Sequence, residues 1–366
     1  MNNELALIGQ HYVVSWFAVF TAAGCLAGTI LACIIRALQK RAVSDVLIAV
    51  TFAVPLGLML GRVYYCLFAA SDYPSVWQML WLPNGGYGLL GGILGVFLAA
   101  ALAFALFRME GFGELLDCLA LGGLAAIITG RFASGFSGSE LGYEVPFRLF
   151  TVYNEEKKLR VLAVYELDGL VDAVILVVCV CYWMVVRRKN QNARTGGLTA
   201  LLMLGLHGAN QVVMESMRSD ALKLGANDFI KSSQILGVCC CVAALVTCMV
   251  RVIRAKGFHR NDLFYVLASV CCIALGVLAE WRVGKGDYVI RHVLMLAVMF
   301  ALGAITVRYG VAAGLAASSV PRADEAPVAD EALTEDDDYP VAEQAVPDDR
   351  RRSYWIVRDT RQEYDE

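Results

Sequence analysis

Four polar side chains recur along one stretch of otherwise apolar sequence, and their types suit proton transfer and anion binding. His207, Gln211, Glu215 and Arg218 are spaced at i, i+4, i+8 and i+11, on one face of a helix. An imidazole accepts a proton near neutral pH, and a guanidinium binds phosphate through two parallel hydrogen bonds. Such a stripe within a membrane span is predicted to face the bundle interior or a wet cavity, because lipid exposure is costly. A purely structural hydrogen-bond network is the alternative interpretation.

A second polar group lies in the stretch GRFASGFSGSELGYE (130–144), which is predicted to begin where a long apolar helix ends. Arg131 supplies a cation, Glu140 supplies an acid, and several glycines allow a ligand to approach the backbone closely. An arginine at the bilayer centre costs about 2.5 to 3.5 kcal/mol, so an arginine beside a span indicates a function. The stretch therefore predicts a site for an anionic lipid head group.

Composition places the chain among polytopic membrane proteins. Of its 366 residues 58% are hydrophobic and 18% charged, with a mean hydropathy of +0.59. No dense basic block interleaves with aromatic residues, which argues against a nucleic-acid partner. The 12 cysteines lie in or beside apolar runs without metal-ligand spacing to histidine, so we interpret them as small hydrophobes. The sequence contains no metal or nucleotide motif, and no cofactor is expected.

Nine apolar stretches are predicted to span the membrane. They are 12–35, 43–69, 86–107, 115–133, 167–186, 197–216, 233–250, 262–280 and 289–313. Arginine and lysine residues are concentrated after the first, fifth and seventh stretches. By the positive-inside rule these connections are cytoplasmic, so the N-terminus is expected outside.

The predicted fold is an all-α polytopic membrane protein, a helical bundle with three regions. Residues 1–250 form the membrane core, with 131–166 as its longest extracytoplasmic segment, in which TVYNEEKKLRVLAVYE predicts a short hairpin or an interfacial helix. Residues 251–317 carry two additional spans. Residues 318–366 are acidic and punctuated by proline, which predicts a disordered cytoplasmic tail.

Two motifs of the second and third spans have both a structural and a functional interpretation. Arg62 lies in GRVYYCLF, where it either contacts a ligand or extends to the membrane interface among tyrosines such as Tyr65. The stretch GGYGLLGGILG contains the pair Gly91 and Gly92. Small residues at these spacings favour close contact between helices over a ligand role.

Taken together, the motifs resemble the bacterial prolipoprotein diacylglyceryl transferase family over roughly residues 12 to 250. GRVYYCLF resembles the family element GRLxYVLF, and GGYGLLGGILG resembles the HGGL-type opening of its third span. GRFASGFSGSELG is similar to the signature GRIGNFINGELWG, with one residue inserted before the acid. VYELDGL and HGANQVVMESMR are similar to LYEALLEG and YGLFRFLVEFLR. The order of these motifs, their spacing and their placement relative to the membrane all agree with the family pattern.

The resemblance implies a fold, an activity and partners. It implies an integral enzyme of the bacterial plasma membrane with seven core spans, to which this chain adds two C-terminal spans. Such an enzyme moves diacylglyceryl from phosphatidylglycerol, or another anionic phospholipid, to the lipobox cysteine of a prelipoprotein and releases glycerol phosphate.

The needs of this reaction and the chemistry of the side chains predict roles for residues of this chain. His207 would be the base, Arg131 a phosphate clamp, and Glu140 the acid that orients the arginine; these three form the predicted catalytic group. Either Arg62 or Arg218 would be the second cation. The predicted substrate-binding residues are Arg62, Tyr65, Gly91, Gly92, Ser134, Tyr165, Gln211, Glu215 and Arg218.

Several positions depart from the family pattern. Leu90 stands where a histidine normally precedes the paired glycines, and Ser134 or Gly135 replaces the signature asparagine. His207 and Gln211 stand where the family has an essential tyrosine and an essential arginine. Two other functions are therefore considered: a non-catalytic relative that binds lipid or lipoprotein, and a transporter. The absence of an evident internal repeat in the sequence disfavours the transporter.

Overall fold

Long helices make up most of the protein, for which a computed structural model describes residues 4–8, 12–70, 73, 75–80, 86–154, 158–189, 196–223, 231–282 and 288–316. All described elements lie in one compact unit, Met1–Val320. The long helices are α1 Trp16–Leu38, α2 Ser44–Phe68, α4 Leu89–Phe107, α5 Phe112–Ser137, α6 Val164–Lys189, α7 Leu198–Met217, α8 Ser232–Lys256, α9 Arg260–Arg282 and α10 Tyr288–Ala316. The acidic tail predicted for 318–366 lies outside the described residues.

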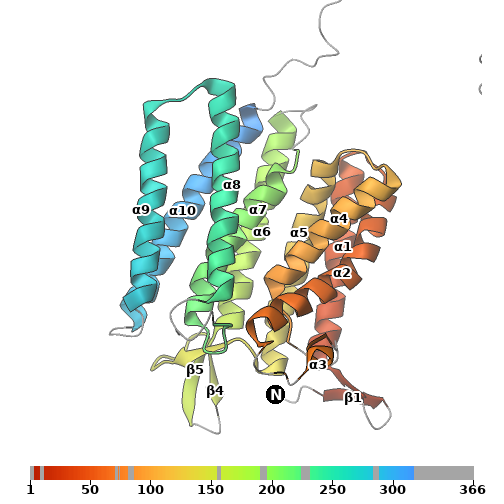
Figure 1. The fold of residues 1–366 in the computed structure, drawn as a ribbon, viewed down its shortest axis with the longest axis vertical. Helices are drawn as coiled ribbons and strands as arrows, with labels where there is room; N and C mark the ends of the chain where they lie inside the picture. Colours follow the sequence, from red (N-terminus) through yellow and green to blue (C-terminus); the bar gives the residue numbers. More distant parts are fainter. Residues whose placement is uncertain are drawn as a thin grey trace, which may run out of the picture. The chain divides into compact units, whose positions relative to one another are not determined.

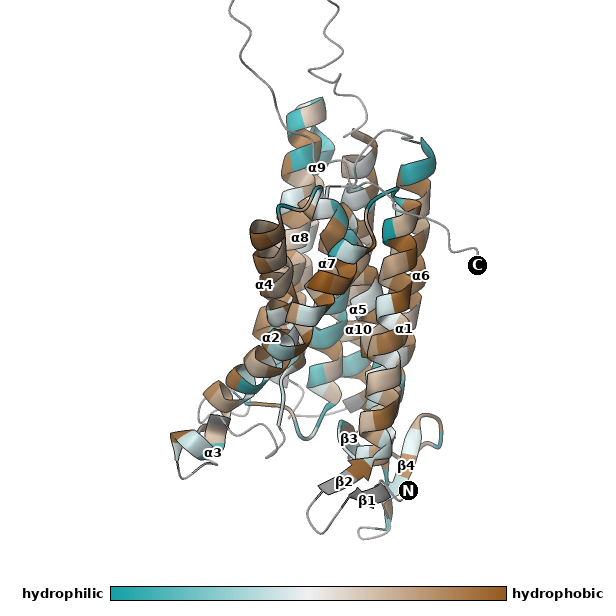
Figure 2. Ribbon diagram, turned by 90° about the vertical axis from the view of Figure 1, so that its right-hand side faces the viewer, coloured by the Kyte–Doolittle hydropathy of each residue, from teal (hydrophilic) through white to brown (hydrophobic). Residues whose placement is uncertain are grey.

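Each of the nine predicted spans corresponds to one of these helices. Eight of the described helices are long and apolar enough to cross a membrane. The ninth, α7, carries the polar stripe, which lowers its hydropathy, and it packs against α5, α6, α8 and α10. Figure 2 shows apolar residues along most of the helix lengths. The prediction of an all-α polytopic membrane protein is confirmed.

The helices pack closely where both partners have small residues. α1 lies along α5, α2 along α4, and α7 along α8 (Figure 1). A Cβ atom at Gly91 of α4 would lie 2.5 Å from the Leu60 carbonyl oxygen of α2, which is closer than atoms can approach. The same holds for Gly28 of α1 against the Gly122 carbonyl of α5. The interpretation of the third-span glycines as a close helix contact is therefore confirmed.

Short elements complete the described chain. They are β1 Glu4–Ile8, β2 Tyr12–Ser15, α3 Val76–Leu80, β3 Leu141–Glu144, β4 Thr151–Asn154 and β5 Leu159–Ala163. β4 and β5 form an antiparallel hairpin in which Val152 pairs with Val161, and β5 also pairs with β3. Of the two predictions for this segment, the hairpin is the one observed.

Among the predicted span boundaries that differ from the structure are the start of the first span and the end of the fourth. Residues 12–15 form β2, paired with β1, so the first span begins at Trp16 rather than at residue 12. The fourth span continues past residue 133 to Ser137 and ends at Gly138, whose φ of 67° is a left-handed conformation that favours glycine. Arg131 therefore lies within α5, nearly two turns before its end.

One end of the bundle brings together segments that are far apart in the sequence. The C-terminal ends of α5 and α7 and the N-terminal ends of α6 and α8 lie there, beside the sheet of β3, β4 and β5 (Figure 1). The basic residues Arg187 and Lys189 end α6 at the opposite end of the bundle (Figure 1). The end with the sheet is called the site end below.

Candidate functional site

A buried ion network connects α5, α6 and α7 near the site end. Its members are Arg131, Glu140, Asp168, Asp172, His207, Asn210, Gln211, Glu215, Arg218 and Asp220. Charged groups in a membrane bundle are stable only when they are paired and hydrogen-bonded. The network contains six of the predicted site residues: His207, Arg131, Glu140, Gln211, Glu215 and Arg218.

Arg131 lies at the centre of the network and has partners on three sides. Its Nε lies 2.8 Å from Asp168 Oδ2, and its Nη2 donates to Gln211 Oε1 at 3.1 Å. Its Nη1 pairs with Glu140 Oε1. The side chain is 7% exposed, so these partners hold the guanidinium in a single orientation.

Two acids on α6, which the sequence analysis missed, form the inner part of the network. Asp168 accepts hydrogen bonds from Asn210 at 2.6 Å and from the Gln211 amide at 3.1 Å. Asp172 accepts from Asn210 at 3.1 Å. Two aspartates four residues apart in an apolar span share a helix face, and this spacing was the available signal.

His207 is the innermost member of the network and is completely buried. Its Nδ1 lies 2.9 Å from Asp172 Oδ1. Within the described part of the chain, Nε2 has no hydrogen-bond partner. When the ring carries its hydrogen on Nδ1, Asp172 accepts that hydrogen and Nε2 can accept a proton from another group.

Arg218 forms the outer part of the network, where α7 ends. It donates to Asp220 at 3.0 Å and to Glu215 at 3.1 Å, and its Nη1 lies 3.5 Å from Glu140 Oε1. The Glu140 backbone amide donates to Asp220 at 3.0 Å. Glu140 has a φ of 60°, which is uncommon for a residue other than glycine and marks a backbone held by its surroundings. Glu140 thus contacts both arginines.

The outer groups have shifted pKa values. Burial raises the pKa of Asp220, but hydrogen bonding and attraction from Arg218 outweigh it, so the pKa is lowered from its usual value. For Arg218, burial lowers the pKa, and the Glu215 and Glu140 carboxylates more than compensate, so the pKa is raised. Both groups are therefore charged at neutral pH.

Arg62 lies elsewhere, on α2, and is almost completely buried. It donates to the backbone carbonyls of Met79 at 2.6 Å and Gly86 at 3.0 Å. Its guanidinium carbon lies 5.0 Å from the centre of the Tyr73 ring. Arg62 therefore fixes the connection after α2 rather than extending to the interface, and of the two predicted second cations, it is Arg218 that shares a carboxylate with Arg131.

The remaining predicted residues lie at helix contacts or beside a groove. The Tyr65 ring of α2 lies so close to Gly86 that a Cβ atom on residue 86 would clash with it. Gly91 and Gly92 of α4 face α2. Ser134 donates to the Gly130 carbonyl at 3.2 Å within α5. These contacts pack neighbouring elements together or lie within α5, and none of them is with a member of the ion network.

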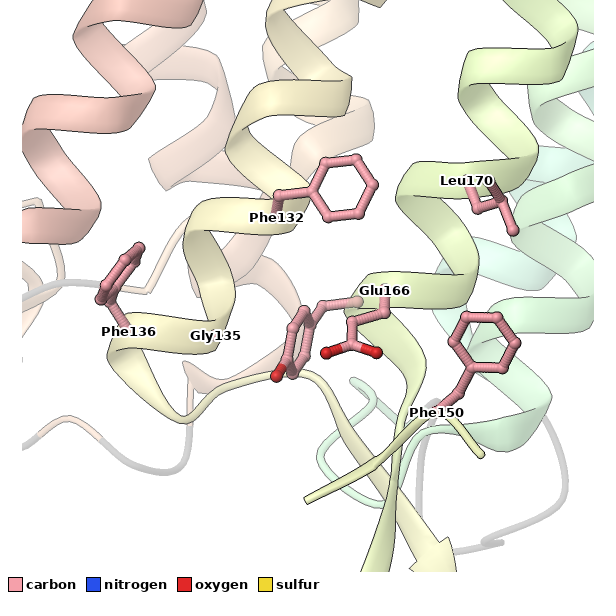
Figure 3. A pocket seen from close by; sticks show the side chains of 7 residues that line it. Phe132, Gly135, Phe136, Phe150, Glu166 and Leu170 are labelled. Atoms are coloured by element: carbon pink, nitrogen blue, oxygen red, sulfur yellow. The ribbon is translucent and has the colours of Figure 1, made fainter. Parts of the chain in front are cut away.

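Tyr165 lines an open groove between α5 and α6, next to the ion network. The groove has a volume of about 340 Å³ and is lined by Phe132, Gly135, Phe136, Phe150, Tyr165, Glu166 and Leu170. Figure 3 shows the rings of Phe132 and Phe136 on the α5 side and Glu166 with Leu170 on the α6 side. Gly169 lies against both Phe132 and the Arg131 Cβ, so the groove and the network occupy adjacent faces of the α5–α6 contact. The phenylalanine and leucine side chains of this wall suit a lipid chain.

The site combines a base candidate, two guanidinium groups and an apolar wall. Its two guanidiniums pair with four carboxylates, those of Glu140, Asp168, Glu215 and Asp220, so an incoming anion has to take the place of a carboxylate. Asp220, whose side chain is 42% exposed, is the most accessible of them. Among the described residues, no cluster of three or more His, Cys, Asp or Glu side chains could hold a metal ion.

Comparison with known proteins identifies the family of the chain. A family model described as prolipoprotein diacylglyceryl transferase matches residues 5–250. A phosphatidylglycerol–prolipoprotein diacylglyceryl transferase of Lactococcus lactis subsp. cremoris (strain MG1363) is 28% identical over 265 residues, 69% of this chain and 95% of the relative. One from Clostridium perfringens (strain 13 / Type A) is 23% identical over 257 residues, 69% of this chain and 96% of the relative.

The region that the family model matches ends within α8, before the last two helices. It includes α1 to α7 and most of α8, and therefore every member of the ion network, whereas α9 and α10 follow it. Since the family model matches well over half of the chain and contains the whole site, this chain belongs to the prolipoprotein diacylglyceryl transferase family.

Proposed function

We propose that the chain transfers a diacylglyceryl group from phosphatidylglycerol to the lipobox cysteine thiol of a prelipoprotein. Family membership and the names of the bacterial relatives support this activity. The observation that carries the proposal is that Arg131 and Arg218 share the Glu140 carboxylate beside an apolar groove. Two guanidiniums next to a largely apolar groove match a phospholipid, which has an anionic phosphate beside apolar chains.

The reaction needs a base and a stabilised leaving group. The cysteine sulfur attacks the glyceryl carbon, the bond from that carbon to the phosphate oxygen breaks, and glycerol phosphate leaves with the electron pair. The thiol proton passes to a base, because the thiolate is the nucleophile. His207 is the proposed base, through Nε2, and Asp172 orients its ring and stabilises the charged form. Leu90, at the family's histidine position, is a buried apolar residue without this capacity.

The leaving phosphate is bound by the arginines in order of their accessibility. Arg218 is 17% exposed and Asp220 is 42% exposed, so the phosphate displaces Asp220 from Arg218 first. Arg131 is less exposed than Arg218 and pairs with the same Glu140 carboxylate, so the phosphate contacts it second. Gln211 is neutral where the family has an arginine, and the loss of one charge-stabilising group typically costs about 10² to 10³ in rate. We therefore expect a slow transferase.

The proposed location is the bacterial plasma membrane, with the N-terminus and the site end outside. The structure has several membrane-spanning helices, and the relatives are bacterial. Arg187 and Lys189 lie at the end of α6 opposite the site end, and basic ends of spans favour the cytoplasm. A lipobox on a secreted precursor then meets the site from the outer half of the membrane.

A lipidation assay in cells tests the proposal. The chain is expressed as the sole diacylglyceryl transferase in a depleted bacterial strain, and a lipobox reporter is analysed by mass spectrometry. We expect a mass gain of one diacylglyceryl group, abolished by Arg131→Ala and strongly reduced by His207→Ala. Matched control changes at the opposite end, in the exposed Arg188→Ala and His259→Ala variants, should leave the gain unchanged.

The same assay separates the alternatives. No mass gain from a well-expressed, membrane-inserted chain would overturn the transferase proposal. If such a chain still co-purified with phosphatidylglycerol, it would be a lipid-binding relative that has lost the reaction. A mass gain in the Arg131→Ala variant would show that the ion network is not the site.

A further inference from the structure

The two helices that follow the family match, α9 and α10, are connected to the site end by polar contacts. α10 packs against α7, α8 and α9. α9 ends and α10 begins at the site end (Figure 1). Glu280 near the end of α9 and His292 near the start of α10 therefore both lie close to the last turn of α7.

Ser216 of α7 is the residue that these two side chains contact. Its hydroxyl donates to Glu280 Oε2 at 2.5 Å and lies 3.3 Å from His292 Nε2. Ser216 is completely buried, and His292 is nearly so. Polar contacts between buried helices of a membrane bundle fix one relative position of those helices, because loss of the contact leaves polar groups unpaired.

Lys231, which immediately precedes α8, also contacts the last turn of α7. Its ammonium group donates to three backbone carbonyls, those of Ser216 at 3.1 Å, Arg218 at 3.2 Å and Glu215. A cation at this position satisfies the free carbonyls of a helix C-terminus and complements its dipole. Burial lowers the pKa of Lys231, and the Glu280 and Glu215 carboxylates oppose this shift. Glu280 thus also favours the charged form that caps α7.

The turn held in this way carries the outer part of the ion network. Glu215 and Arg218 lie on either side of Ser216, and Arg218 contacts Glu140 and Asp220. Any displacement of the Ser216 turn therefore moves the guanidinium that is proposed to meet the phosphate first.

We propose that Glu280 and His292 of the added helices are positioning residues for Arg218, acting through Ser216 and the Lys231 cap. This assigns to α9 and α10 the role of fixing the phosphate-binding end of α7. The inference rests on the proposed function for its kinetic consequence. Its structural part, the ordering of the turn, stands independently.

The test uses the full chain in phosphatidylglycerol vesicles with Ser216→Ala and Glu280→Ala. Ser216→Ala removes the contacts with little change in volume, so it remains informative if Glu280→Ala folds poorly. Leu278→Ala, an exposed α9 position, is the matched control. A displacement of about 1 Å at a reacting group can cost 10²-fold, so we expect a 10- to 100-fold fall in kcat/KM, mainly through KM for the lipid.

Two readouts distinguish positioning from general destabilisation. If Glu280 acts through Arg218, Glu280→Ala should have little further effect in an Arg218→Gln background, and Glu280→Asp should recover part of the loss. Backbone hydrogen exchange at Arg218, whose amide donates to the Glu215 carbonyl at 3.3 Å, should accelerate in both Ser216→Ala and Glu280→Ala.

The outcomes separate this inference from the proposed function. Unchanged exchange at Arg218, or fully additive kinetic effects, overturns the positioning role even if the chain is an active transferase. If the wild-type chain transfers no lipid but exchange at Arg218 still accelerates, the positioning role stands and the proposed function fails.

Discussion

The ion pair between Arg131 and Asp168 gives the sharpest energetic test of the site. Arg131 Nε lies 2.8 Å from Asp168 Oδ2, and the two side chains are 7% and 3% exposed. Removing one partner of such a pair leaves an uncompensated buried charge and costs about 3 to 5 kcal/mol of unfolding free energy. We therefore expect Arg131→Gln and Asp168→Asn each to destabilise the fold by this amount.

The double variant should lose much less than the sum of the single variants. With both charges removed, no uncompensated charge remains at this pair, and the Gln211 amide, which contacts both side chains, can bridge the two new amides. We expect a coupling free energy of about 2 to 3 kcal/mol, in the upper range for groups in contact.

The assay is reversible unfolding of the purified chain in mixed micelles, with the free energy extrapolated to zero denaturant. Asp220→Asn is the matched control, because its carboxylate also pairs with an arginine but is 42% exposed, and an exposed pair contributes about 0 to 1 kcal/mol. If the stability loss of the double variant equals the sum of the two single losses to within about 0.5 kcal/mol, Arg131 and Asp168 are not energetically coupled and this account of the network is wrong.

Three further predictions follow from individual contacts. Asp172→Asn should lower the single-turnover transfer rate by about 10² to 10⁴, because His207 loses the carboxylate that orients it. Because the pKa of Asp220 is lowered in the folded protein, its ion pair stabilises the fold above about pH 3.9, and this stabilisation is lost as the pH falls through the folded pKa. Thermal unfolding of Asp220→Asn at a series of acidic pH values should therefore show a smaller loss of stability than the wild type. Gly91→Ala should destabilise the fold by about 1 to 3 kcal/mol through overpacking against α2, whereas Gly123→Ala, with open space around it, should not; denaturant unfolding of the two variants checks this.

The sequence predicted the membrane helices well, because their apolar runs carry a strong signal. The second span was expected at 43–69 and is observed at Ser44–Phe68. The strand β2 was missed because its residues, YVVS, are as apolar as the helix that follows. The end of α5 was placed too early because the glycines after Arg131 were interpreted as part of a ligand-binding loop. Of these glycines only Gly138 adopts the left-handed conformation, and α5 continues to Ser137.

Six of the ten residues of the ion network were predicted from the sequence, and their contacts were predicted only in part. The helical spacing of the stripe correctly placed His207, Gln211 and Glu215 on one face of α7, whereas Arg218 follows the end of the helix in an extended conformation. Their partners come from α5 and α6, and only tertiary packing decides which residues of those helices face α7. The pairing of His207 with Asp172 and the separate location of Arg62 could therefore not be derived from the sequence.

The most direct test of the transferase proposal is the stoichiometry of the reaction with purified components. The full chain is incubated with phosphatidylglycerol vesicles and a lipobox peptide, and both the peptide mass and the released glycerol phosphate are measured over time. We predict one diacylglyceryl group added to the peptide cysteine for each glycerol phosphate released, with both products absent in Arg131→Ala. Glycerol phosphate release without peptide modification, or no release from a folded chain, would contradict the proposal.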